Sequence, residues 1–134
     1  MLFVTLGPRR YRIERPFGDI PKNHGTVSDV AVDADGHIHV GLRRDPYTDA
    51  PGPAVVVLDT QGRRLRQYGE EVLDLHMLDA APDGLMWLVD RDAHEAIGFD
   101  AEGVAQKRLG TRHGAGQPFN SPCDIAFAAD GTAY

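Results

Sequence analysis

The stretch Val30-Ala-Val-Asp-Ala-Asp-Gly36 returns twice along the chain, as Leu78-Asp-Ala-Ala-Pro-Asp-Gly84 and as Ile125-Ala-Phe-Ala-Ala-Asp-Gly131. The last glycines of these three segments are 48 and 47 residues apart. A second pair lies between them, Val57-Leu-Asp-Thr-Gln-Gly62 and Gly98-Phe-Asp-Ala-Glu-Gly103. Each segment joins two short apolar runs through a turn that ends in Gly. This pattern predicts a β-hairpin, because Gly accepts the positive φ of a tight turn.

Two hairpins in each repeat give units of four short strands. We expect strands at 28–33, 37–41, 54–59 and 64–68 in the first unit, and at 76–81, 85–90, 95–100 and 104–109 in the second. A third unit begins near residue 123, and Tyr11–Arg15 alternates as one more strand. We find no long stretch with a helical period. Four-stranded units that repeat every 40–50 residues or so are typical of a β-propeller, with a β-sandwich as the alternative.

The sequence therefore predicts an all-β chain: one incomplete β-propeller of four-stranded antiparallel blades over residues 1–134. We expect the first blade at 26–69, the second at 70–110, the start of a third at 120–134 and a closing strand at 11–15. This amounts to about 2.5–3 blades, whereas propellers have roughly four to eight. We therefore expect missing blades or a self-association partner to cover the apolar faces that an open arc exposes.

Composition narrows the classes of partner and compartment. The 134 residues include 14 Lys and Arg against 20 Asp and Glu, a net charge of −6, which argues against a nucleic-acid partner. No apolar run approaches the roughly 18–20 residues of a membrane span, so we expect no membrane partner. The apolar start has no basic region before it, so we expect a cytoplasmic protein without a signal peptide. The excess of Arg over Lys hints at a bacterial source.

Polar side chains gather where the meander would bring strand ends together at one face, the top of the blades. They come from the loop that opens with Arg43 and Arg44, from His76 at the entry of a strand, and from the connector 110–123. Long loops on a rigid scaffold are where binding sites are built. The arginines are either solvated loop charges or donors to an anionic ligand, since a guanidinium matches a carboxylate.

Other candidates have structural interpretations. We expect the turn carboxylates to be structural; they are Asp33, Asp35, Asp83 and Asp130. His37 and His39 share one strand face, which we expect to lie in solvent because Ile38 and Val40 supply the buried face. Cys123 has no identifiable activating base and is interpreted as structural. The basic run Arg63, Arg64 and Arg66 is interpreted as solvated charge on an outer strand.

Three longer stretches match a known family in residue type and spacing. The first is Val27-Ser-Asp-Val-Ala-Val-Asp-Ala-Asp-Gly36 followed by Val40-Gly-Leu-Arg43. The second is Leu75-His-Met-Leu-Asp-Ala-Ala-Pro-Asp-Gly-Leu-Met-Trp-Leu-Val-Asp90, and the third runs from Gly110 to Ala126. Over residues 20–134 the chain resembles the N-terminal part of the NHL-repeat six-bladed β-propellers, and most closely the branch around the peptidyl-α-hydroxyglycine amidating lyases.

The resemblance implies a metal-dependent carbon–nitrogen lyase that acts on a small peptide or anionic molecule. It assigns a zinc ligand to His76, the substrate carboxylate to Arg43, and two calcium-binding backbone carbonyls to Val30 and Leu78. The family's remaining zinc ligands and its catalytic base would lie beyond residue 134, so we expect this portion to be inactive by itself. The alternative is a non-enzymatic NHL propeller scaffold that binds a protein or a small anionic ligand on its top face.

Overall fold

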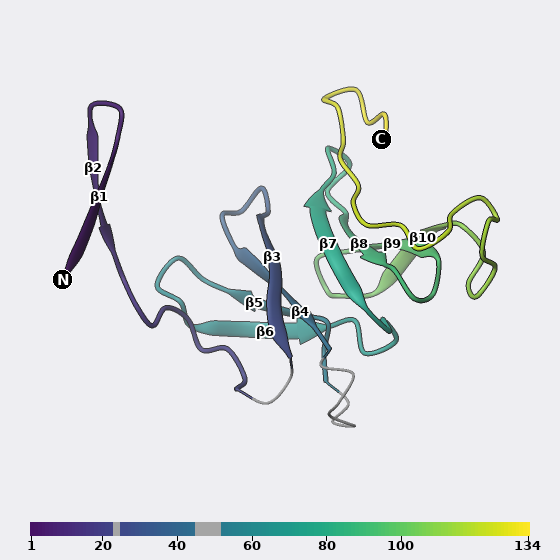
Figure 1. Cartoon of the computed structure of the whole chain (residues 1–134), viewed down its shortest axis with the longest axis horizontal. Coiled ribbons are helices and arrows are strands. Elements are labelled where there is room, and N and C mark those ends of the chain that lie inside the picture. The colour runs from purple at the N-terminus through teal and green to yellow at the C-terminus, as the bar shows by residue number, and fades with distance from the viewer. Residues whose placement is uncertain (23–24, 45–51) are drawn as a thin grey trace.

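The computed structural model describes residues 1–22, 25–44 and 52–134, and these residues form antiparallel β-sheets without a helix (Figure 1). The all-β prediction is thereby confirmed. In the part of the chain that is described, no helix is long and apolar enough to cross a membrane. The strands are β1 Leu2–Leu6, β2 Arg9–Ile13, β3 Thr26–Val32, β4 Ile38–Arg43, β5 Val55–Leu58, β6 Arg64–Tyr68, β7 Leu75–Ala80, β8 Met86–Asp90, β9 Glu95–Phe99 and β10 Ala105–Leu109.

Two four-stranded meanders make up most of the structure. One sheet has the order β3-β4-β5-β6 and the other β7-β8-β9-β10, and every neighbouring pair is antiparallel. All eight predicted strands of the two units are present, with bounds that differ by at most two residues. A further hairpin begins after them, where Phe127 pairs with Ala133. The four-stranded pattern that the repeats predicted is therefore correct.

The N-terminal strand differs from its prediction. The strand expected at 11–15 lies at Arg9–Ile13 and pairs with β1, which the sequence analysis did not predict. Gly7, with a φ of 57°, and Pro8 make the turn between them. This β1–β2 hairpin stands apart from the two larger sheets (Figure 1). The apolar run Leu2–Leu6 has no alternation of polar and apolar residues, which is why a period of two did not reveal it.

Three of the hairpin turns, those of Asp33, Asp59 and Asp100, share one hydrogen-bonding pattern. The side chain of Asp33 accepts the backbone N–H groups of residues 35 and 37, and Asp59 and Asp100 do the same two and four residues further on. Such Asx turns satisfy backbone donors at the strand end. The following glycines have positive φ, for example 84° at Gly36. In the turns that end at Gly84 and Gly131, Asp83 and Asp130 each accept one backbone N–H, two residues further on. These turn residues are thus explained by local backbone needs.

The two large sheets are packed on both of their faces. One apolar cluster lies between the sheets and includes Val55, Val57, Leu78, Leu88 and Phe99. A second covers the other face of β4 and β5, and a third covers the other face of β8 and β9, where Ile125 and Phe127 pack on it. Central strands buried on both faces read as continuous apolar runs rather than as alternation.

The first strands of the two sheets, β3 and β7, lie side by side where the sheets meet. The N–H of Leu78 donates to Oδ2 of Asp29 at 3.0 Å, which ties the second sheet to the first. Gly41 of β4 allows this close approach, since a Cβ there would lie 2.6 Å from Cδ2 of Leu78. The ends of β4 and β7 are thereby brought together, and these ends carry the candidate site.

Candidate functional site

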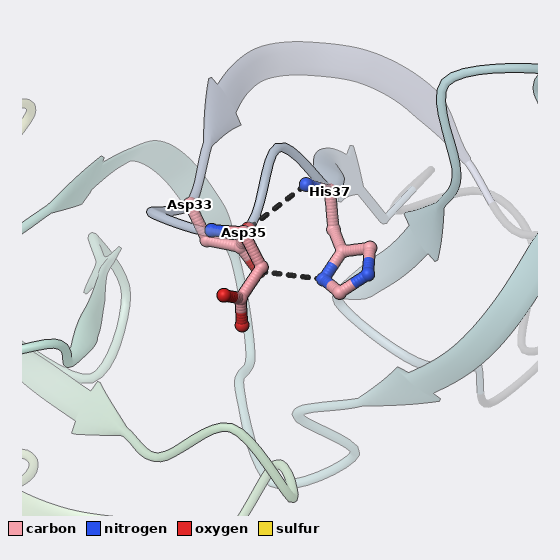
Figure 2. A group of neighbouring side chains, drawn as sticks. All are labelled: Asp33, Asp35 and His37. Atoms are coloured by element: carbon pink, nitrogen blue, oxygen red, sulfur yellow. Dashed lines mark hydrogen bonds and ion pairs between the residues drawn. The ribbon is translucent and has the colours of Figure 1, made fainter.

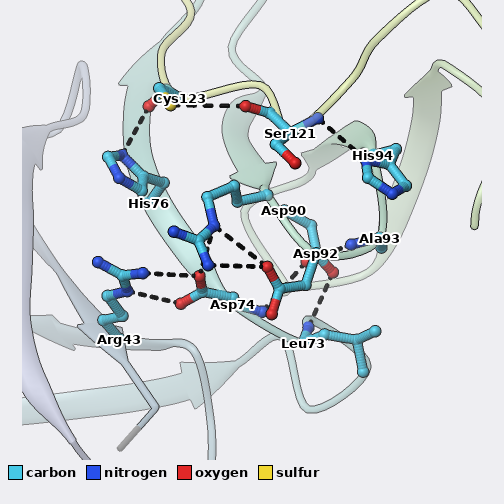
Figure 3. Close-up of polar contacts among 11 residues, drawn as sticks. Arg43, Leu73, Asp74, His76, Asp90, Asp92, Ala93, His94, Ser121 and Cys123 are labelled. Atoms are coloured by element: carbon cyan, nitrogen blue, oxygen red, sulfur yellow. Dashed lines mark hydrogen bonds and ion pairs between the residues drawn. The ribbon is translucent and has the colours of Figure 1, made fainter. Parts of the chain in front are cut away.

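Arg43 ends β4, and its guanidinium reaches across to the loop before β7. Its Nε donates to Oδ1 of Asp74 at 2.7 Å and its Nη2 to Oδ2 at 3.0 Å, a bidentate pair (Figure 3). The hydrogen bonds and the charge of Asp74 raise the pKa of Arg43. One long edge of the guanidinium is therefore used within the protein, and the edge formed by Nη1 and Nη2 has no hydrogen-bond partner among the described residues.

Asp74 is buried, and it is held from several sides. Its carboxylate also pairs with Nε of Arg91 at 3.1 Å. Its own N–H donates to Oδ1 of Asp90 at 3.1 Å, and its carbonyl accepts the N–H of Arg91 at 3.0 Å. A carboxylate fixed in this way can fix the side chain that it binds.

Behind Asp74 lies a network of two buried carboxylates. Asp90 is 0% exposed and accepts three backbone N–H groups, from Leu73 at 2.8 Å, Asp74 at 3.1 Å and Ala93 at 3.1 Å. Glu95 is 1% exposed and pairs with Arg112 at 2.6 Å and Arg108 at 2.9 Å. Since both acids are hydrogen-bonded and paired, this end of the second sheet is a rigid platform.

His76 points its Nδ1 at the carbonyl of Cys123, 3.0 Å away (Figure 3). A carbonyl only accepts, so Nδ1 carries the proton, and in the neutral imidazole the lone pair is on Nε2. Ligating histidines are usually held in this manner by a second hydrogen bond on the opposite nitrogen. The predicted zinc ligand is thus oriented by the connector 110–123.

Arg43 and His76 line one pocket of about 400 Å³, which is completed by Thr26, Val27, Ser28 and Met77. The hydroxyl of Ser28 is buried and has no hydrogen-bond partner within the described residues. A pocket lined by a cation and an imidazole suits a small polar ligand. The structure therefore brings Arg43 and His76 to one pocket, and the connector reaches it only through the Cys123 carbonyl on His76.

Arg44 and the predicted calcium ligands lie elsewhere. Nη2 of Arg44 donates to the carbonyls of Glu70 at 3.0 Å and Gly52 at 3.4 Å, so Arg44 braces loops rather than lining the pocket. Val30 and Leu78 sit on the adjacent strands β3 and β7, and their role as calcium ligands stays a prediction. The rest of the predicted loop, 45–51, lies outside the described residues.

The expectation that His39 faces solvent is wrong. His39 is 3% exposed; its Nδ1 lies 2.9 Å from the hydroxyl of Tyr68, and its Nε2 lies 3.1 Å from Oδ2 of Asp33. The error arose because β4 is covered on both faces: Val40 and Leu42 pack on one side, and Tyr68 meets His39 on the other. Alternation therefore does not separate an exposed face from a buried one. Burial lowers the pKa of His39 and raises that of Tyr68.

Asp33, Asp35 and His37 gather in the first hairpin turn and offer three groups that could hold a metal ion (Figure 2). The hydrogen bonds of Asp33 argue against that use. Its Oδ1 accepts two backbone N–H groups, and its Oδ2 faces Nδ1 of His37 and Nε2 of His39, both at 3.1 Å. The hydrogen-bonding capacity of the Asp33 carboxylate is thus already used within the protein. The three side chains lie together because they build the turn.

Acid should weaken the fold through Asp33. Burial alone would raise its pKa, but hydrogen bonds from His39 and His37 outweigh burial and lower the pKa from 3.8 to about 2. The stabilisation is therefore present above pH 3.8 and is lost as the pH falls toward 2. We expect Asp33→Asn to remove about 1–2 kcal/mol of this pH dependence in urea unfolding between pH 2 and 6 or so.

Asp35→Asn is the matched control, because the Asp35 carboxylate accepts no hydrogen bond from the described residues. It should keep the wild-type pH profile. A profile for Asp33→Asn that follows the wild type down to the lowest pH would contradict the assigned role of Asp33.

Sequence reasoning missed Asp74, Asp90, Arg91 and Tyr68 as members of polar networks. The one available signal was periodic: Arg43 and Arg91 each follow the turn glycine of their repeat by seven residues. Comparison with known proteins adds nothing to this geometry, since the chain matches no family model and no curated protein.

Proposed function

We propose that the chain is part of an NHL-type propeller related to the amidating lyases, and that its Arg43–His76 pocket binds a small molecule or peptide end that carries a carboxylate. Two successive four-stranded meanders, with their first strands side by side, are the arrangement expected of neighbouring blades. The carrying observation is that Arg43 and His76, from two different sheets, line one pocket.

Arg43 and His76 each use one group within the protein and leave another group for a ligand. Asp74 binds one edge of the Arg43 guanidinium and leaves the Nη1–Nη2 edge for a ligand carboxylate. The carbonyl of Cys123 takes the Nδ1 proton of His76 and leaves Nε2 for a ligand or a metal.

Zinc fits His76 as a single ligand. A bound zinc would supply Lewis acidity toward a substrate hydroxyl. Catalytic zinc sites ordinarily use three protein ligands, and around His76 the described residues offer no cluster of metal-binding groups. Arg43 would orient the carboxylate, and His76 would hold one coordination position. We therefore propose that this chain alone binds ligand without turning it over. Calcium on the carbonyls of Val30 and Leu78 is proposed only on the family resemblance.

Two related probes test the pocket. N-acetylglycine carries a carboxylate, and N-acetylglycinamide has the same shape without the charge. We expect wild type to prefer N-acetylglycine, and Arg43→Ala to lose about tenfold or more of the affinity for it, the scale of a lost charge-assisted contact. His76→Ala should keep the preference and lose the zinc bound per chain. Isothermal titration calorimetry measures both.

Arg44→Ala is the control, because it removes a neighbouring arginine that lies outside the pocket. Its preference for N-acetylglycine should equal that of wild type. Equal affinity of Arg43→Ala and wild type for N-acetylglycine would remove Arg43 from the site.

The alternative is a scaffold that binds a protein or small anion without catalysis. The exposed valines of β3 favour it, since Val27, Val30 and Val32 are 50%, 56% and 57% exposed and make an apolar surface. Metal analysis of the purified chain discriminates the two functions. Zinc that wild type takes up in dialysis and that His76→Ala does not take up supports the lyase-related proposal, and no uptake at His76 at any zinc concentration supports the scaffold.

A further inference from the structure

We propose that Asp74 is a positioning residue for ligand recognition by Arg43, and that the ligand carboxylate is met end-on by Nη1 and Nη2. This inference rests on the proposed function of the pocket. The inference adds Asp74 to the pocket as a residue that touches no ligand but determines the orientation of the Arg43 guanidinium.

The geometry of the pair leads to this proposal. Asp74 takes Nε and one hydrogen of Nη2, at 2.7 and 3.0 Å, so both bonds lie along one edge of the planar guanidinium. The second hydrogen of Nη2 and both hydrogens of Nη1 remain for another acceptor. Figure 3 shows the third nitrogen of Arg43 directed away from Asp74.

Asp74 can do this because it is buried and held by hydrogen bonds on both sides. Its side chain is 9% exposed, and its backbone is tied to Asp90 and Arg91 on both sides. The side chain of Arg43, by contrast, is 39% exposed and would sample many rotamers without a partner. Preorganisation of this kind raises affinity by lowering the entropy lost on binding.

Asp74 need not neutralise Arg43. Its carboxylate is shared with Arg91, whose Nε lies 3.1 Å from Oδ2. Two guanidinium groups thus divide one negative charge, although Arg91 also faces Asp92 at 3.1 Å. Arg43 retains positive charge toward the pocket.

The sign of one mutation separates positioning from simple electrostatics. Asp74→Asn removes a negative charge beside the pocket, so Coulomb attraction alone would strengthen binding of an anion. Loss of the fixed guanidinium would weaken it. We expect the preference for N-acetylglycine over N-acetylglycinamide to fall about fivefold or more, with the affinity for the amide unchanged.

Asp92→Asn is the matched control, because it removes a nearby exposed carboxylate that pairs with Arg91 and not with Arg43. Its preference should equal or slightly exceed that of wild type. Asp74→Glu, which keeps the charge but displaces the carboxylate, should lose about threefold. It replaces Asp74→Asn in the test if thermal unfolding shows that Asp74→Asn does not fold.

The outcomes are distinct. Wild type without a preference for N-acetylglycine would overturn the proposed function and this inference together. Wild type with the preference, and an Asp74 variant that keeps or increases it, would overturn the inference alone. An equal fall in affinity for both probes would make Asp74 merely structural, which also overturns it.

Discussion

Replacing Asp90 with alanine is expected to lower the free energy of unfolding by about 3–5 kcal/mol. The Asp90 carboxylate is fully buried and accepts the N–H groups of Leu73, Asp74 and Ala93. Alanine would leave three backbone donors unpaired in a place that water does not reach. It would also release the loop that carries Asp74, so the platform under Arg43 should loosen with the fold.

Urea unfolding at neutral pH measures this loss. Asp90→Asn retains one acceptor oxygen and should lie between alanine and wild type. Asp92→Ala, two residues away with an exposed side chain, should change stability by less than about 1 kcal/mol. If Asp90→Ala also changes the free energy of unfolding by less than about 1 kcal/mol, Asp90 does not organise this end of the sheet.

Phe99→Ala should destabilise the chain by about 3–5 kcal/mol, because it empties the centre of the cluster between the sheets. Phe99 is 1% exposed, and its ring centroid lies 5.1 Å from that of Tyr68 in the other sheet. The cavity would therefore weaken both sheets, although the mutation lies in β9 alone.

Hydrogen exchange tests that consequence. Amide protection should fall together in β5–β6 and in β8–β9, since one cluster serves both. Phe17→Ala, at a residue that is 42% exposed, is the control and should change stability by less than about 1 kcal/mol. Loss of protection confined to β7–β10 would mean that the sheets fold independently and that their packing is not shared.

The strand pattern could be predicted from sequence because it depends on local chemistry. Gly36 and Gly84 need positive φ, and Asp33 closes its turn through its own neighbours. These requirements repeat at nearly constant spacing, so the hairpins, and hence the meanders, can be predicted from the amino-acid sequence alone. The strand Leu2–Leu6 lacked both alternation and a repeat partner, and it was missed.

The polar networks depend on packing between sheets, which no local pattern encodes. Arg43 meets Asp74 across the two sheets and across 31 positions of sequence. His39 meets Tyr68 across 29 positions within one sheet, a pairing that is equally absent from any local pattern. His39 was expected to face solvent because it alternates with Ile38 and Val40, and only the face of those two residues was expected to be buried. His39 is buried on the other face, where its ring meets Tyr68 of the same sheet and Asp33 of the hairpin turn.

The most direct measurement of the central claim is a crystal structure of the chain grown with zinc and N-acetylglycine. We expect two consecutive four-stranded sheets, with the N-acetylglycine carboxylate on Nη1 and Nη2 of Arg43 and zinc on Nε2 of His76, in one pocket. Zinc bound at Asp33, Asp35 and His37 instead, with no ligand at Arg43, would contradict the account.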